Sequence, residues 1–114
     1  MLMKDICSVV KGTVICGEKR LGEDVKYAFS SDLMSDVLTI KKNHFLLITG
    51  LSNSQSIRTA EMSDAPYLIL CRGKIASPEM VELAKENDIL IISTPFSMFK
   101  CSGLLYNAGL KPVY

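Results

Sequence analysis

The chain has 114 residues and a mass of 12.6 kDa, which is the length of one domain. Apolar residues make up 48% of the sequence and charged residues 22%, a composition that excludes an intrinsically disordered chain. Thirteen basic and twelve acidic residues give a net charge of +1, so we expect no nucleic-acid partner, which would require a basic excess. We therefore expect a single domain over residues 1–114.

No apolar stretch approaches the roughly 18 residues needed to cross a bilayer, and the N-terminal segment lacks the long apolar stretch of a signal peptide. We therefore expect no membrane partner. The four cysteines, Cys7, Cys16, Cys71 and Cys101, form no C-x-x-C pair, and His44 is the single histidine, so no metal site and no cofactor are expected. Three of the cysteines lie among apolar neighbours, as buried thiols do in a reducing compartment, which favours a cytoplasmic location.

The first half of the chain alternates short helices and strands. In chain order we expect a helix over residues 2–10, strands over 13–16 and 25–29 with a solvated loop between them, a helix over 31–38, a strand over 44–49 and a helix over 54–62. Gly12 suits the position just after the first helix, and Ala65-Pro66 ends the third.

The second half has a more regular pattern. Tyr67–Cys71 and Ile89–Ile92 are continuous apolar runs, as expected for strands that are covered on both faces. Ser77 precedes a proline at the first position of a helix that runs to Asn87, and Ser97 caps a last helix that ends before Gly109. This alternation predicts a three-layer α/β/α domain, with a mixed or mainly parallel sheet and helices on both faces.

Three strand-to-helix turns, at residues 49–53, 72–77 and 94–97, are expected at one edge of this sheet. Each leads into a helix N-terminus, where free amides and the helix dipole favour an anion. The candidate ligand-binding residues in these turns are Thr49, Gly50, Asn53, Arg72, Gly73, Lys74 and Thr94. Alternatively, these are the ordinary turns and caps of an α/β domain, and Arg72 is a structural partner of Asp64 or Glu61. Neither a P-loop nor a G-x-G-x-x-G motif is present.

Other polar residues give weaker patterns. Asp32, Ser35, Asp36 and Thr39 are spaced to lie along one polar face of a helix, where they could bind a cation or act as an acid/base pair, or simply face solvent. His44 has no evident orienting partner, and Arg58 with Glu61 forms a candidate i,i+3 surface ion pair. No nucleophile, base and oxyanion site assemble, so no catalytic residue is expected.

The segment from Ile48 to Gly109 resembles the DRTGG domain family. The matching features are the apolar strand Tyr67–Cys71 followed by Arg72-Gly73-Lys74, the helix segment Pro78–Ala84, and the strand that ends in Ser93-Thr94-Pro95-Phe96; Asp32–Leu38 is similar to the stand-alone members of anaerobic bacteria. The resemblance implies a fold like the N-terminal domain of HPr kinase/phosphorylase. It implies no kinase activity, because that chemistry resides in a separate P-loop domain.

The chain departs from the family signature at two places. Ser52-Asn53-Ser54-Gln55 stands where the family commonly has Asp-Arg, and Cys71-Arg72-Gly73 stands where it has Thr-Gly-Gly. Arg72 could supply a charge that the family sequence places elsewhere.

The resemblance implies a non-catalytic regulatory or ligand-sensing module that dimerises, with a small anion or nucleotide in the crevice at the carboxyl ends of the strands. The alternative is a protein-interaction adaptor for a redox enzyme or a signalling kinase of an anaerobic bacterium. We expect a homodimer, and four apolar side chains are candidate contacts unless they belong to the core: Met34, Met62, Met98 and Phe99.

Overall fold

The computed structural model describes residues 1–114, and every helix and strand expected from the sequence is present, some with different bounds. The elements in chain order are α1 (Met3–Val9), β1 (Thr13–Cys16), the 3-10 helix η1 (Glu18–Arg20), β2 (Tyr27–Ser30), α2 (Met34–Val37), β3 (Leu46–Thr49), α3 (Ser54–Met62), β4 (Tyr67–Leu70), α4 (Pro78–Glu86), β5 (Leu90–Ser93), α5 (Met98–Asn107) and β6 (Lys111–Pro112). None of the helices has the length and apolar character that crossing a bilayer requires.

The six strands form one sheet in the order β1-β5-β4-β3-β2-β6. β1 pairs antiparallel with β5, through a register shift between Val14 and Cys16, and all other neighbours are parallel. The sheet is therefore mixed and mainly parallel, as predicted. β4 and β5 both have a strand on either side, which confirms that the two continuous apolar runs lie inside the sheet.

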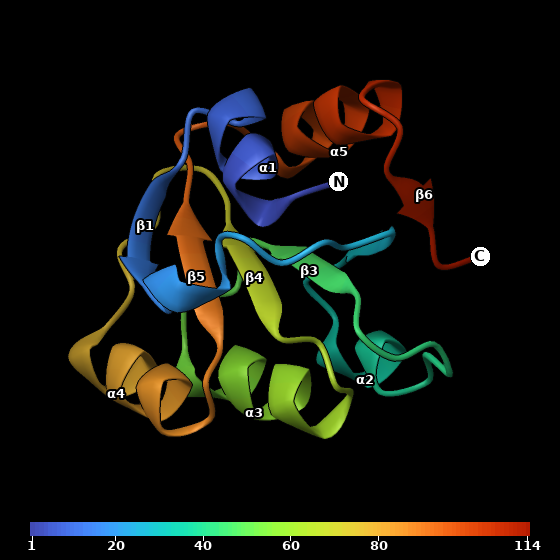
Figure 1. Cartoon of the computed structure of the whole chain (residues 1–114). Coiled ribbons are helices and arrows are strands. Elements are labelled where there is room, and N and C mark those ends of the chain that lie inside the picture. The colour runs from blue at the N-terminus through green and yellow to red at the C-terminus, as the bar shows by residue number, and fades with distance from the viewer.

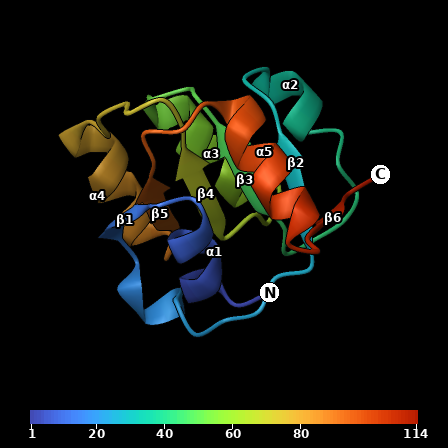
Figure 2. The same ribbon diagram turned by 90° about the horizontal axis from the view of Figure 1, so that it is seen from above.

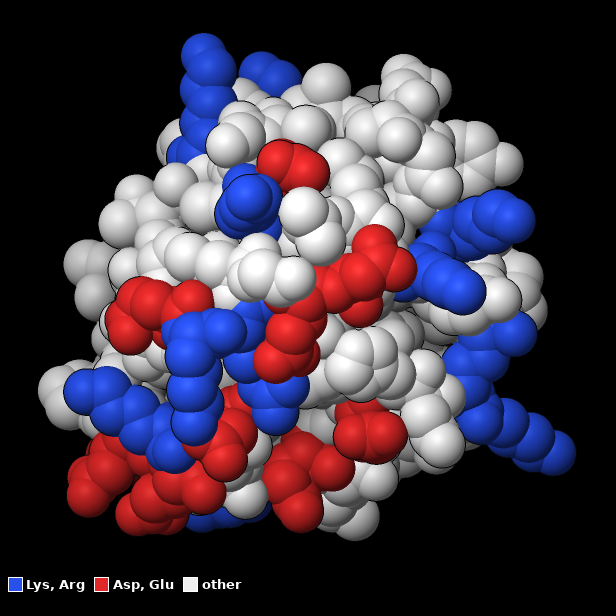
Figure 3. Space-filling model, in the orientation of Figure 1, with Lys and Arg blue, Asp and Glu red and all other residues white.

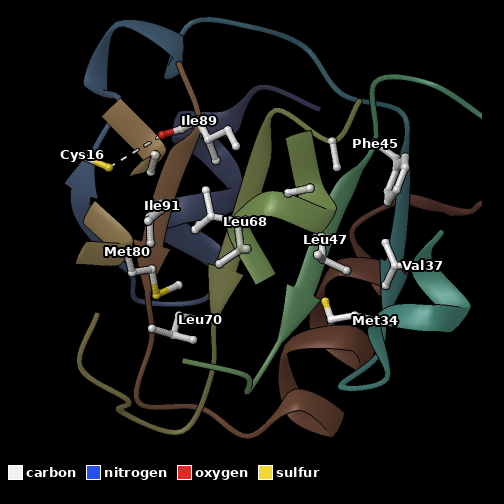
Figure 4. Packing of buried hydrophobic residues seen from close by; sticks show 14 of the residues in the cluster. Cys16, Met34, Val37, Phe45, Leu47, Leu68, Leu70, Met80, Ile89 and Ile91 are labelled. Atoms are coloured by element: carbon white, nitrogen blue, oxygen red, sulfur yellow. Dashed lines mark hydrogen bonds between the residues drawn. The ribbon is translucent and has the colours of Figure 1, made fainter. Parts of the chain in front are cut away.

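Helices cover both faces of the sheet. Figure 1 shows α1 and α5 on one face and α2, α3 and α4 on the other, and Figure 2 looks down on α1 and α5 side by side. Alternate strand residues contribute to two separate cores: Leu68 and Leu70 pack toward α3 and α4 (Figure 4), whereas Tyr67 and Ile69 pack toward α1 and α5. The three-layer prediction is confirmed.

The predicted helix over residues 31–38 is wrong at its beginning. α2 contains only Met34–Val37, and the segment before it is a turn in which the Leu33 N–H donates to the Ser31 hydroxyl at 3.0 Å. Asp32 therefore lies outside the helix and does not share a polar face with Ser35 and Asp36. The physical reason is that the Asp32 side chain accepts hydrogen bonds from the end of β3, which holds this segment against the sheet.

Two further sequence expectations need correction or completion. Arg58 and Glu61 do not form an ion pair, because the three pairs of the chain are Met1–Asp24, Lys19–Asp88 and Arg20–Glu23. The strand β6 was not expected, since Pro112 lacks the N–H that a central strand requires. After the left-handed Gly109, the chain returns along the sheet edge, where the Lys111 N–H donates to the Lys26 carbonyl at 2.9 Å.

Candidate ligand-binding site

The three predicted turns meet at one edge of the sheet, because β3, β4 and β5 are adjacent and parallel. Backbone hydrogen bonds join them directly: the Cys71 N–H donates to the Thr49 carbonyl, and the Gly73 N–H donates to the Thr94 carbonyl, both at 2.9 Å. The Ser52 hydroxyl adds a bond of 2.6 Å to the Ile75 carbonyl. The residues that the sequence singled out are therefore neighbours across the carboxyl ends of the central strands.

Thr49 and Thr94 end β3 and follow β5, respectively, and each hydroxyl stabilises the turn that begins there. The Thr49 hydroxyl accepts from the Leu51 N–H at 3.1 Å, and the Thr94 hydroxyl accepts from the Phe96 N–H at 3.2 Å. Both side chains are fully buried. Since the Thr94 hydroxyl also donates to the Val10 carbonyl at 2.6 Å, these two threonines form the framework of the site.

The Gly50 turn already binds a carboxylate of the chain itself. One Asp32 oxygen, Oδ1, accepts from the Gly50 N–H at 2.6 Å and from the Thr49 hydroxyl at 3.0 Å. An anion-binding arrangement therefore exists at the end of β3, as the sequence suggested, but Asp32 fills it. On the far side of this turn, the Asn53 side chain accepts from the Ser56 N–H at 3.3 Å and so caps α3.

Arg72 and Gly73 both adopt the left-handed conformation directly after β4, with φ angles of 63° and 65°. Their N–H groups donate to the Phe96 and Thr94 carbonyls at 2.8 and 2.9 Å, so the backbone donors of this turn are used within the chain. The side chains of Arg72 and Lys74 are exposed and form no ion pair. The Arg72-Gly73-Lys74 segment therefore presents charged side chains to solvent.

The interpretation of Arg72 as a structural partner of Asp64 or Glu61 is wrong. Arg72 follows β4, whereas Asp64 precedes it, and the Asp64 carbonyl is bound at the opposite edge by the His44 N–H at 2.8 Å. Glu61 lies in the last turn of α3, which leads toward that same opposite edge. Arg72 therefore forms no ion pair with either Asp64 or Glu61.

Two lysines that the sequence reasoning missed also lie at this edge. Lys11 follows Val10, the residue whose carbonyl accepts from the Thr94 hydroxyl, and it is exposed. Lys100 holds its ammonium 3.9 Å from the centre of the Phe96 ring. No sequence signal marks Lys11, which reaches this edge because the antiparallel pairing brings the start of β1 beside the end of β5.

A family model of the DRTGG domain matches residues 5–108 of the 114. The chain belongs to the DRTGG domain family. A solved structure of the CBS and DRTGG domains from the regulatory region of Clostridium perfringens pyrophosphatase, in complex with the activator diadenosine tetraphosphate, is similar with a TM-score of 0.74. It shares 23% sequence identity with this chain, and the match covers 91% of this chain but 45% of that one. This chain therefore spans less than half of the similar one, and the similarity shows the fold. No curated protein matches the chain.

A second polar group of this DRTGG domain lies at the opposite edge of the sheet. The hydroxyl of the buried Tyr67 donates to Glu23 Oε1 at 2.8 Å and lies 2.7 Å from His44 Nε2, and Arg20 donates to the same Glu23 oxygen at 2.7 Å. Burial and the hydrogen bond to Glu23 raise the pKa of Tyr67, so its hydroxyl keeps its proton. The prediction that His44 has no orienting partner is wrong, because the Tyr67 hydroxyl holds its ring.

Cys71 is not an activated nucleophile. Cys71 directly precedes Arg72, but the neighbouring Cys101 thiol and burial both raise the pKa of Cys71, which keeps it protonated. All four cysteines of the DRTGG domain are free thiols, and no three His, Cys, Asp or Glu side chains are placed to hold a metal ion. The exposed side chains of Arg72 and Lys74 give this edge the means to recognise negative charge.

Proposed function

We propose that this chain is a non-catalytic regulatory domain that senses a phosphate-bearing anion at the carboxyl edge of its sheet. The observation that supports the proposal is the gathering of four cationic side chains, none in an ion pair, around the turns after β4 and β5. These are Lys11, Arg72, Lys74 and Lys100. Asp32 is an acid at the same edge of the sheet, and its carboxylate is already bound by Gly50 and Thr49.

Within this proposal the seven predicted residues have different tasks. Arg72 and Lys74 bind the anion; Arg72 offers a planar fork that can bond two phosphate oxygens, whereas Lys74 adds a mobile point charge. Gly73 gives the turn its left-handed backbone. Thr49, Thr94 and Asn53 hold the three turns, and Gly50 positions Asp32 as a neighbouring negative charge that limits how close an anion can approach.

The comparisons support the class of ligand and the regulatory role. The similar Clostridium perfringens structure is a regulatory region bound to a nucleotide activator, diadenosine tetraphosphate, which carries a chain of phosphates. A nucleotide polyphosphate suits a site with several separated cations better than a single carboxylate does, because each phosphate brings its own charge. We propose this ligand class for the present chain, and the cell interior as the place where it acts.

We also propose that the domain acts as a homodimer, through exposed apolar side chains. The sequence suggested four side chains as dimer contacts. The prediction for Met34 is wrong, because this side chain is buried in the core beside α3, and Met98 packs partly against the other core. Met62 and Phe99 remain, with 70% and 90% of their surface exposed. They lie on opposite faces of the sheet, so a single two-fold contact uses one of them, and we propose Phe99 as that contact.

The test of ligand sensing is a comparison of two charge-removing variants with a matched control. We expect inorganic pyrophosphate and nucleoside polyphosphates to raise the melting temperature of the wild-type chain by mass action. Arg72→Ala should weaken binding by on the order of 1.5–3 kcal/mol, the value of a hydrogen bond to a charged group, and Lys74→Ala by less. Arg58→Ala, which removes the same charge from α3, should leave binding unchanged.

Equal responses of the wild-type chain and Arg72→Ala to these anions would overturn the proposed site. An absence of any response across a panel of nucleotides and acyl phosphates would favour the alternative, an adaptor that binds a redox enzyme or a signalling kinase.

A further inference from the structure

The face of α5 that points away from the sheet is apolar and uncovered. Phe99 exposes 90% of its surface and Tyr106 exposes 67%, and both lie on this face, opposite the buried Cys101 and Leu105. At 3.6 residues per turn, Phe99, Gly103 and Tyr106 fall within a sector of about 60°. Figure 3 shows that the upper right of the molecule, where α5 lies in Figure 1, is almost free of charged side chains.

Gly103 has no explanation within one copy of the chain. It lies in the middle of α5 with ordinary helical backbone, and a Cβ atom added to it would meet no other atom within 4 Å. Glycine destabilises the interior of an exposed helix relative to alanine, so neither the fold of the monomer nor its packing requires a glycine here. A glycine at this position would instead allow another molecule to approach the helix backbone closely.

We infer that α5 is the seam of a homodimer in which two copies of the helix cross antiparallel at Gly103. The inference rests on the homodimer of the proposed function and names its interface. With a rise of 1.5 Å per residue, Phe99 lies about 6 Å to one side of Gly103 and Tyr106 about 4.5 Å to the other. Each Phe99 therefore faces a Tyr106 across a two-fold axis, which gives two identical aromatic pairs.

The occupant that fits this face best is a second copy, because the face is complementary to itself. A glycine at the crossing lets the two helix axes approach more closely than the 8–10 Å set by larger side chains. α5 contains no acidic residue, and its one charge, Lys100, is drawn over the Phe96 ring of its own chain, so the face offers no charge pattern for an unlike partner.

The exposed aromatic area also approaches that of a specific interface. An apolar cavity of about 190 Å³ continues the face past Tyr106 toward Phe29 and Tyr114, and Tyr114 is 81% exposed. If each large aromatic side chain offers about 200 Å², Phe99, Tyr106 and Tyr114 supply roughly 480 Å² per copy. Two copies together offer about 950 Å² from these side chains alone, close to the value of about 1,000 Å² that a biological interface should exceed.

The test combines cross-linking with association measurements. Cys7 is the one native cysteine that is not fully buried, so all variants carry Cys7→Ser. Under a mild oxidant, Gly103→Cys should form an intermolecular disulfide, because the two-fold axis places both copies of this residue within the Cα separation that a disulfide spans. Met62→Cys, equally accessible on α3, should stay monomeric in the same conditions.

Gly103→Leu distinguishes a weakened dimer from a misfolded monomer, because the two change different measured quantities. We expect it to raise the dissociation constant of the dimer at least about tenfold, while the melting temperature of the separated monomer stays equal or rises because leucine favours the helix. Phe99→Ser should also weaken the dimer, and Met62→Ser should not. Sedimentation velocity over a range of concentrations measures the dissociation constants of the wild-type chain and the three variants.

The outcomes separate this inference from the proposed function. A wild-type dimer that Gly103→Leu does not weaken, or a Gly103→Cys variant that does not cross-link, overturns the α5 seam and leaves the dimer standing. A wild-type chain that stays monomeric at about 100 μM, where a dimer with a dissociation constant of about 10 μM would form, overturns both the dimer and its seam. Anion sensing is judged separately, by the response of the melting temperature to pyrophosphate.

Discussion

Replacing Asp32 by asparagine should lower the stability of the fold and raise its affinity for anions. The carboxylate accepts from the Gly50 N–H at 2.6 Å and from the Thr49 hydroxyl at 3.0 Å, and an asparagine side chain can keep both bonds through its own oxygen. What is lost is the charge. Hydrogen bonds to charged groups contribute about 1.5–3 kcal/mol and neutral ones about 0.5–1.5 kcal/mol.

The expected loss in the free energy of unfolding is about 1 kcal/mol, because the bond to Gly50 is exposed to solvent. In a domain of this size, that corresponds to a fall of roughly 4 °C in melting temperature. The anion affinity should change in the opposite direction, since a unit charge about 4 Å away in water contributes about 1 kcal/mol of repulsion, or roughly a fivefold weakening. Asp32→Asn should therefore bind pyrophosphate several-fold more tightly than the wild-type chain.

Thermal unfolding measures the first effect, and titration calorimetry with pyrophosphate at low and high ionic strength measures the second, which salt should diminish. Asp36→Asn is the matched control: this acid lies on α2, and its hydrogen bond is accepted by the backbone carbonyl and not by the side chain, so neither quantity should change. An Asp32→Asn variant whose pyrophosphate affinity equals or falls below that of the wild type would refute the reasoning, because the anion would then not lie near this carboxylate.

Three other predictions concern the opposite edge of the sheet and the turn before η1. Tyr67→Phe should lower the free energy of unfolding by about 1–2 kcal/mol, measured in urea, because Glu23 and His44 lose the hydroxyl between them. Burial acts to raise the pKa of Glu23, but hydrogen bonds from Tyr67 and Arg20 outweigh it and lower this pKa below the value of 4.5. Its stabilising contribution is therefore present above pH 4.5 and is lost as the pH falls below it, so Glu23→Gln should unfold with a flatter acid dependence in a pH series; an unchanged slope would contradict the pairing. Gly17→Ala should cost about 1–3 kcal/mol, because φ is 83° and the new Cβ would lie 2.6 Å from the Leu90 Cα, whereas Gly22→Ala, with open space around it, should change stability by less than about 0.5 kcal/mol.

The architecture could be predicted because its signals are local. Tyr67–Leu70 and Leu90–Ser93 are apolar at successive positions, and a strand with such a sequence has to be covered on both faces wherever it lies in the chain. Ser77 and Ser97 accept from the N–H groups of Met80 and Lys100, as helix caps do, so the starts of α4 and α5 were visible in the sequence.

The details of the site could not be predicted because they depend on residues far apart in the chain. The donors that bind Asp32 come 17 and 18 residues later, and the spacing of acids within 32–39 contains no information about them. His44 and Tyr67 are 23 residues apart and meet only because their segments lie at the same edge. Lys11 joins the cationic group through the antiparallel pairing of β1, a direction that hydrophobic patterns do not encode.

The two edges of the sheet restrict how copies of this domain can associate. At one edge, β1 is four residues long and is interrupted by a bulge between Val14 and Cys16. At the other, β6 has only two residues, and Pro112 has no N–H to offer a neighbouring strand. Short, irregular edge strands of this kind hinder edge-to-edge pairing between the sheets of different copies, which would otherwise continue into open assemblies. The helical faces are thus the surfaces left for a two-fold contact, which would close after two copies and leave the carboxyl edge of each sheet open to solvent.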